Sequence, residues 1–148
     1  MAYAALITWF AAVLLGLYML AVWLIENDVT DRGAAPSRLP VVIIFTHLGL
    51  AAAGLAMWVV YLVLDRRVFA WTAIAILGVI AALGATMFLR WIPVYREPET
   101  RATGQLSTAA HSGPAEGNFP VAVVAAHGLF AVTTLVLAIL AALGPGVA

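Results

Sequence analysis

Four long runs of the chain contain no charged side chain. They are Met1–Ile25, Leu39–Leu64, Val68–Leu89 and Gly117–Ala148. Each is long enough for the roughly 20 helical residues that cross a hydrocarbon core, and none alternates apolar and polar residues as a barrel strand does. Backbone exposed to lipid must satisfy its own hydrogen bonds, which favours helices. We therefore predict an all-α, integral membrane four-helix bundle in one domain, with helices at about residues 3–25, 40–64, 69–91 and 119–143.

Three polar connections join these runs, at Glu26–Arg38, Asp65–Arg67 and Ile92–Asn118. With an up-down-up-down path, the first and third connections share one side of the membrane, here called the loop side. Both chain ends and the tight second connection share the other, the termini side. Aromatic residues near the span ends are typical of membrane interfaces. Those expected on the loop side are Trp23, Trp91 and Tyr95, and those on the termini side are Tyr3, Tyr61 and Trp71.

The remaining polar features set further expectations. No basic segment precedes the first run, so we expect this helix to be retained rather than cleaved as a signal peptide. The connection 92–118 is rich in Thr, Ser, Gly and Ala, which predicts a loop that is mobile or held by a partner. Five arginines fall on the loop side and two on the termini side, but the loop side also carries more acids and longer loops. Membrane orientation therefore stays open.

The composition excludes several classes of protein. Hydrophobic residues make up 65% of the chain and charged residues 9%, against about 25% charged in soluble domains. The chain has no cysteine, which excludes disulfides, thiolate metal sites and covalently attached haem. Its net charge is zero without a basic stripe, so no nucleic-acid partner is expected. The lipid bilayer is the expected partner, in a prokaryotic cell membrane.

Two pairs of motifs recur in the same order and suggest an internal repeat. "GLYMLAVW" (Gly16–Trp23) matches "GATMFLRW" (Gly84–Trp91) at Gly, Met and Trp. "LPVVIIFTH" (Leu39–His47) matches "FPVAVVAAH" (Phe119–His127) at the proline and the histidine. The halves 1–64 and 65–148 are thus expected to be two similar helical hairpins related by an axis along the membrane normal. Chance similarity between apolar helices is the alternative.

The two histidines are the strongest candidate functional residues. His47 and His127 each follow the proline that opens their helix by seven residues, which places both rings about 10 Å along helices that run in the same direction. In this topology the two helices are diagonal neighbours, with axes about 13 Å apart. Ionisable residues within membranes usually face the bundle interior and mark functional sites. We predict that His47 and His127 hold one metal from opposite sides, as axial ligands of a flat macrocycle.

Small residues share the helix faces of the histidines and leave room for such a ligand. The small residues are Ala51, Gly54, Ala131 and Thr134, and the larger neighbours that would pack at its edges are Leu50 and Phe130. The same residues are equally typical of membrane helices that simply pack closely. A haem also needs partners for its carboxylates, and Arg90 and Arg38 lie at the loop side near the histidines. Alternatively, these arginines reach toward lipid headgroups.

Four membrane helices with one histidine on each of two of them resemble the b-type haem membrane cytochromes. These include the cytochrome b561-like proteins and the haem-bearing membrane anchors of respiratory dehydrogenases. The resemblance covers the four spans and, as ligands, His47 and His127, whereas b561-like proteins usually carry two histidine pairs. It implies a bound haem b, one-electron transfer, and a quinol, a redox protein or a larger respiratory complex as partner. Homo-oligomerisation stays open.

Two rival hypotheses remain. Met19 and Met87 lie one turn inside the matched tryptophans, and two thioethers with two imidazoles would suit Cu(I). Methionine in apolar helices more often fills gaps in the core. In the second hypothesis, the chain is a structural or anchor subunit of a larger complex without a cofactor, and its histidines only form hydrogen bonds between helices. His111, in the long connection, is expected to be solvated. Ser, Asp and Glu occur only in the connections, so no catalytic triad or carboxylate pair can be assembled within the bundle, and an enzyme is less expected than an electron-transfer protein.

Overall fold

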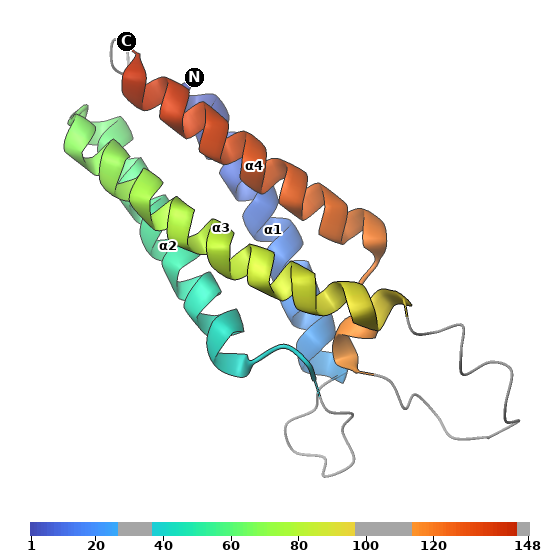
Figure 1. The fold of residues 1–148 in the computed structure, drawn as a ribbon. Coiled ribbons are helices and arrows are strands. Elements are labelled where there is room, and N and C mark those ends of the chain that lie inside the picture. Colours follow the sequence, from blue (N-terminus) through green and yellow to red (C-terminus); the bar gives the residue numbers. More distant parts are fainter. Residues whose placement is uncertain (27–36, 97–113, 145–148) are drawn as a thin grey trace, which may run out of the picture.

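The computed structural model describes residues 1–26, 37–96 and 114–144. Four helices account for most of them, in the order α1 (Ala2–Glu26), α2 (Val41–Leu64), α3 (Arg67–Arg96) and α4 (Val121–Leu143), with a short 3₁₀ helix η2 (Ala115–Asn118) before α4 (Figure 1). All four long helices are long and apolar enough to cross a membrane. The predicted all-α four-helix bundle is confirmed, and the chain has the architecture of a multi-pass membrane protein.

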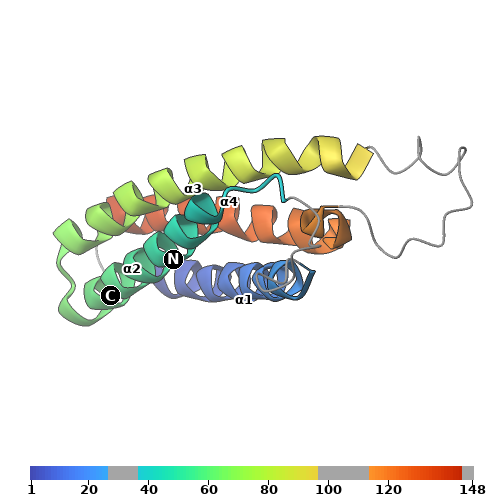
Figure 2. The ribbon, with the colours of Figure 1, turned by 90° about the horizontal axis from the view of Figure 1, so that it is seen from below.

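The helices pack unevenly around the bundle. α1 lies along α4 and α2 lies along α3, whereas α1 with α2 and α3 with α4 make fewer contacts. The diagonal pairs, α1 with α3 and α2 with α4, do not pack together, and Figure 2 shows α1 and α3 on opposite sides of the bundle. The most extensive contacts therefore join the two expected repeat halves to each other rather than the two helices within each half.

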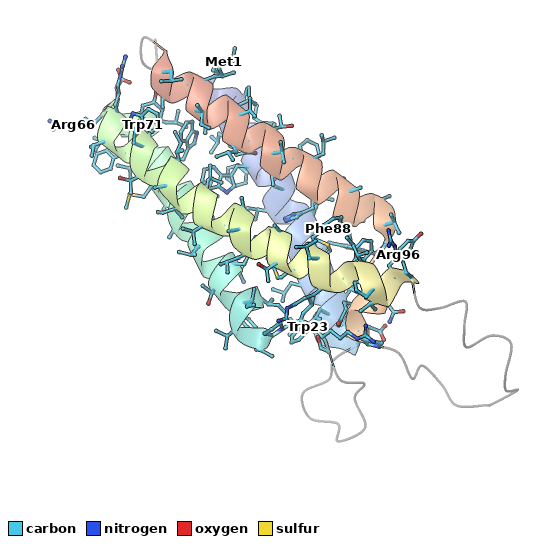
Figure 3. All side chains as sticks on the ribbon, viewed as in Figure 1. Met1, Trp23, Arg66, Trp71, Phe88 and Arg96 are labelled. Atoms are coloured by element: carbon cyan, nitrogen blue, oxygen red, sulfur yellow. The ribbon has the colours of Figure 1, made fainter. Side chains whose placement is uncertain are left out.

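The start of α1, the end of α4 and the α2–α3 turn lie at one end of the bundle, as the alternating path requires. Figure 3 shows Met1, Arg66 and Trp71 at this end, with Trp23 and Arg96 at the opposite, loop-side end. Asp65 ends α2 in the left-handed conformation, with φ of 48°, and its backbone N–H bonds to the carbonyl of Tyr61. This conformation lets the chain reverse within two residues before α3 begins.

Two features of the loop side differ from what the sequence predicts. The third helix was expected to end at about residue 91, but α3 continues through Pro93 to Arg96, and Trp91 and Val94 in this last stretch are buried against the bundle. The connection 92–118 was expected to be mobile or held by a partner, and its described end, Pro114–Asn118, carries η2 with Ala115 and Glu116 buried. Residues 97–113, including His111, lie outside the described part of the chain.

The main core fills the termini-side half of the bundle, called here the packed half. Its buried residues are Ala2, Ala5, Trp9, Trp58, Tyr61, Ala70, Ala73, Leu77, Ile80, Ala138, Ala141 and Ala142. Large aromatic rings cross between the helices, with ring centroids 6.5 Å apart for Trp9 and Trp58 and 5.0 Å for Trp58 and Tyr61. The indole N–H of Trp58 donates to the carbonyl of Ala2 at 3.2 Å. Tyr61, expected at the interface, is fully buried instead.

Candidate cofactor site

His47 on α2 and His127 on α4 face one another across the bundle. Their ring centroids are 6.3 Å apart and the ring planes are inclined by 51°. The helices that carry them do not pack together, so the rings lie between the diagonal helices α2 and α4, as expected from their spacing after Pro40 and Pro120.

Nδ1 of each histidine lies against a neighbouring helix. Nδ1 of His127 is 2.9 Å from the carbonyl oxygen of Ala12 on α1, a distance at which the Nδ1–H tautomer donates a hydrogen bond. Nδ1 of His47 is buried and has no hydrogen-bond partner among the described residues, and a Cβ atom at Gly84 on α3 would lie 3.9 Å from it. A carbonyl at Nδ1 favours the proton on that nitrogen and leaves Nε2 with its lone pair as the metal-binding atom. The His127 imidazole thus suits ligation through Nε2.

Two glycines bring the neighbouring helices against the histidine rings. A Cβ atom at Gly16 on α1 would lie 3.2 Å from Cε1 of His127, and one at Gly84 on α3 would lie 3.3 Å from Cε1 of His47. These glycines are the matched positions of the two sequence motifs, so equivalent positions make equivalent contacts around the histidine pair. Matching the two motifs within the sequence had identified the glycines. Only the packing of α1 on α4 and of α3 on α2 reveals that these positions lie against the imidazoles.

The helical segments around the histidines contain no buried residue. These segments are 13–22 on α1, 41–53 on α2, 81–90 on α3 and 121–133 on α4, and we call them the histidine layer. They span about 15–20 Å of helix at 1.5 Å per residue. Native bundle interiors are otherwise close-packed. The histidine layer therefore differs from the packed half, where large side chains are fully enclosed between the helices.

The predicted neighbours of the histidines divide between these two regions. Ala51, Phe130 and Ala131 are half-buried in the histidine layer. Gly54 lies in the packed half instead, where a Cβ atom would come within 3.0 Å of the indole of Trp9 and 3.1 Å of Ile76. The space expected beside Gly54 for a ligand is thus filled by Trp9, which arrives from α1.

The two predicted arginines lie at the loop-side edge of the histidine layer. Arg90 and Arg38 are both exposed, and the Arg90 guanidinium donates to the backbone carbonyl of Arg38 at 3.3 Å. The contact joins the start of α2 to the end of α3. It places two guanidinium-bearing residues together on the side of the histidines that faces water.

A polar cluster that sequence reasoning missed closes the loop side of the layer. It is built around the buried carboxylate of Glu116, which accepts from the Arg38 backbone N–H at 2.6 Å and from the Ser37 hydroxyl at 3.0 Å. The indoles of Trp23 and Trp91 donate to the Ser37 hydroxyl and to the Glu116 carbonyl. Both tryptophans, expected in the interface belt, are buried. We call these five residues the loop-side cap.

The residues present fit a bis-histidine haem. A metal–nitrogen bond of about 2.0 Å, and about 1.1 Å from Nε2 to the ring centre, would put two axial imidazole centroids about 6.2 Å apart. The centroids of His47 and His127 are 6.3 Å apart. Within the described residues no group of three or more His, Cys, Asp or Glu side chains could hold a bare metal ion. A two-histidine site suits a metal whose remaining ligands come from a macrocycle.

Comparisons with known proteins supply no identity. No protein-family model matches the chain, and neither does any curated protein or solved structure. The candidate site therefore rests on the geometry of this chain alone.

Proposed function

We propose that the protein is a membrane cytochrome that carries electrons on one haem b held between His47 and His127. The observation that carries the proposal is the 6.3 Å separation of the two imidazoles, with Nδ1 of His127 at hydrogen-bond distance from the Ala12 carbonyl. The histidine layer, with no buried side chain of its own, supports it. When bound, the haem would supply one-electron redox chemistry at its iron.

The chain's own residues would orient and shield this group. The Ala12 carbonyl would hold the His127 imidazole with Nε2 available, while Gly16 and Gly84 allow α1 and α3 to approach the rings. Arg90 and Arg38 would neutralise the haem carboxylates on the loop side, because guanidinium pairs well with carboxylate. Two protein ligands leave no open position on the iron, which favours electron transfer over oxygen chemistry.

The proposal is tested by visible spectroscopy of the protein purified in mild detergent from cells supplied with haem. We expect a Soret band in the oxidised protein, and sharp α and β bands after dithionite reduction. His47→Ala and His127→Ala should each lose the low-spin spectrum. Thr46→Ala and Gly128→Ala are matched controls, because Thr46 is exposed and a Cβ atom at Gly128 meets nothing within 4 Å.

A second variant separates ligation from helix packing. His127→Met keeps a side chain that can bind haem iron, and His/Met ligation raises the reduction potential. We expect this variant to retain haem with a more positive midpoint potential. A protein that stays colourless after haem supplementation, or spectra unchanged in both alanine variants, would overturn the haem proposal. Copper analysis of the same preparations then tests Met19 and Met87 as ligands, and co-purification tests an anchor subunit.

A further inference from the structure

Glu116 is a fully buried carboxylate at the loop-side end of a membrane bundle. Its exposed fraction is 0%. It precedes α4 and bonds to the segment that precedes α2, with Arg38 N–H on Oε1 and the Ser37 hydroxyl on Oε2. Burying an acidic side chain is costly, and such groups are retained where their charge or their hydrogen bonds have a use.

The hydrogen bonds around Glu116 are those that a carboxylate accepts. The Ser37 oxygen accepts from the Trp23 indole at 3.0 Å and from the Leu39 N–H at 3.1 Å. Its own hydrogen has two acceptors, Oε2 of Glu116 at 3.0 Å and the Leu39 carbonyl at 3.4 Å, of which Oε2 is the nearer. Oε1 accepts from a backbone N–H, which can only donate. Both oxygens therefore act as acceptors, as in a carboxylate, and a protonated acid would leave a hydrogen pointing at a donor.

The carboxylate lies close enough to the histidine layer to act on it electrostatically. The carboxylate bonds to Ser37 and Arg38, two to three residues before Pro40, and His47 follows Pro40 by seven residues on α2. Seven residues of helix span about 10 Å. The positively charged side chains nearby are Arg38 and Arg90, both exposed to solvent, whereas Glu116 is fully enclosed by protein. Water screens exposed charges more effectively than buried ones.

We propose that Glu116 sets the reduction potential of the site by holding a buried negative charge beside it. The inference rests on the proposed haem function. A nearby anion stabilises the more positive, oxidised iron and so lowers the midpoint potential. At roughly 10–15 Å and an effective dielectric constant of about 20, one unit charge changes the ratio of reduced to oxidised haem roughly tenfold. Glu116 is a positioning and tuning residue and does not contact the haem.

The test is potentiometric titration of the haem-loaded protein with Glu116→Gln, Glu116→Asp and Glu26→Gln. Glu116→Gln keeps the size of the side chain and removes its charge, so we expect a shift to a more positive midpoint of about 59 mV, equivalent to tenfold. Glu116→Asp keeps the charge and should stay near the wild-type value. Glu26→Gln is the matched control, because Glu26 lies on the loop side but is exposed, and its shift should be several-fold smaller.

The possible results separate this inference from the proposed function. A colourless wild-type protein contradicts the haem function itself. A normal low-spin spectrum with an unchanged midpoint in Glu116→Gln, or equal shifts in Glu116→Gln and Glu26→Gln, overturns the tuning role while leaving the haem in place. Tryptophan fluorescence of the haem-free variants reports whether Trp23 and Trp91 keep their places in the cap. If the loop-side cap is lost in Glu116→Gln, the decision passes to Glu116→Asp with its cap intact. A wild-type midpoint potential in that variant supports tuning by the charge of Glu116. A midpoint shifted as far as in Glu116→Gln contradicts it.

Discussion

The two halves of the bundle are built on opposite plans. In the packed half, Trp9, Trp58 and Tyr61 are almost completely buried, and small residues such as Ala73 and Ala138 let the helices approach them. In the histidine layer, the same four helices carry no buried residue over about three turns each. The helices are equally apolar throughout, so hydrophobicity does not distinguish the halves. What distinguishes them is whether large side chains are fully enclosed between the helices.

This contrast suits the proposed haem site, because stability and ligand binding would then depend on different parts of the bundle. Membrane helices gain little from burying apolar groups away from lipid, so their association depends on close packing and hydrogen bonds. The packed half supplies the close packing and the loop-side cap supplies the hydrogen bonds. The histidine layer lies between them and is held in place from both ends. Its own packing is then free to suit a ligand.

The largest effect is expected from removing the central indole of the packed half. Trp9→Ala would leave a cavity against Trp58 and Gly54, and such truncations cost about 3–5 kcal/mol in well-packed cores. We expect a loss of this size in reversible unfolding in mixed detergent micelles. Trp71→Ala is the matched control, because Trp71 is 46% exposed at the same end of the bundle. Equal losses in the two variants would show that the packed half is not the stability core.

Haem binding should stabilise the histidine layer and leave the packed half unchanged. A ligand at one hundred times its dissociation constant stabilises the folded state by about 2.7 kcal/mol. In amide hydrogen exchange of the haem-free protein, we expect segments 81–90 and 121–133 to exchange faster than residues 70–80 of α3. Haem should slow exchange in the first two segments and leave the third unchanged. His127→Ala removes a ligand and should abolish the protection. Uniform protection along α3 would contradict a site confined to the histidine layer.

Alanine substitutions of three glycines compare the halves at single positions. At Gly54 the new Cβ meets the enclosed indole of Trp9 at 3.0 Å, so we expect a loss of about 1–3 kcal/mol in stability. At Gly84 it meets the His47 ring at 3.3 Å, so we expect weaker haem retention with little change in the stability of the haem-free protein. At Gly49 it meets nothing, and neither property should change. Unfolding and haem titration of all three variants measure both effects.

How much of this arrangement the sequence predicts depends on whether a feature is local. Charge-free runs predict the four spans, because length and polarity alone decide whether a helix can cross a membrane. The seven-residue spacing from proline to histidine predicts equal depth for His47 and His127, because helical rise is constant. The structure places these two rings together. That a haem lies between them stays a prediction.

Features that depend on contacts between distant segments were not predictable. Nothing around Gly54 indicates that Trp9 from another helix fills its space. Glu116 lies in a polar loop that composition marks as exposed, and its burial follows only from bonds to Ser37 and Arg38, about eighty residues away. The α3 helix continues past Pro93 because Trp91 and Val94 are held against the bundle. The sequence feature that could have drawn attention to Glu116 is its position four residues before Pro120, at the start of α4.

The smallest effect concerns a hydrogen bond at the boundary between the two halves. The Thr134 hydroxyl, 1% exposed, is 2.9 Å from the Thr8 hydroxyl on α1 and 2.7 Å from the Phe130 carbonyl on its own helix. Thr134→Val keeps the shape and removes the link between α1 and α4. Hydrogen bonds between membrane helices contribute about 0.6 kcal/mol on average, so we expect a loss near that value in the same unfolding assay. Thr72→Val is the control, because the exposed Thr72 hydroxyl bonds only to the Val68 carbonyl of its own helix. If Thr134→Val lost several times more stability than this, polar contacts rather than aromatic packing would hold α1 against α4. The difference between the two halves would then depend on hydrogen bonding.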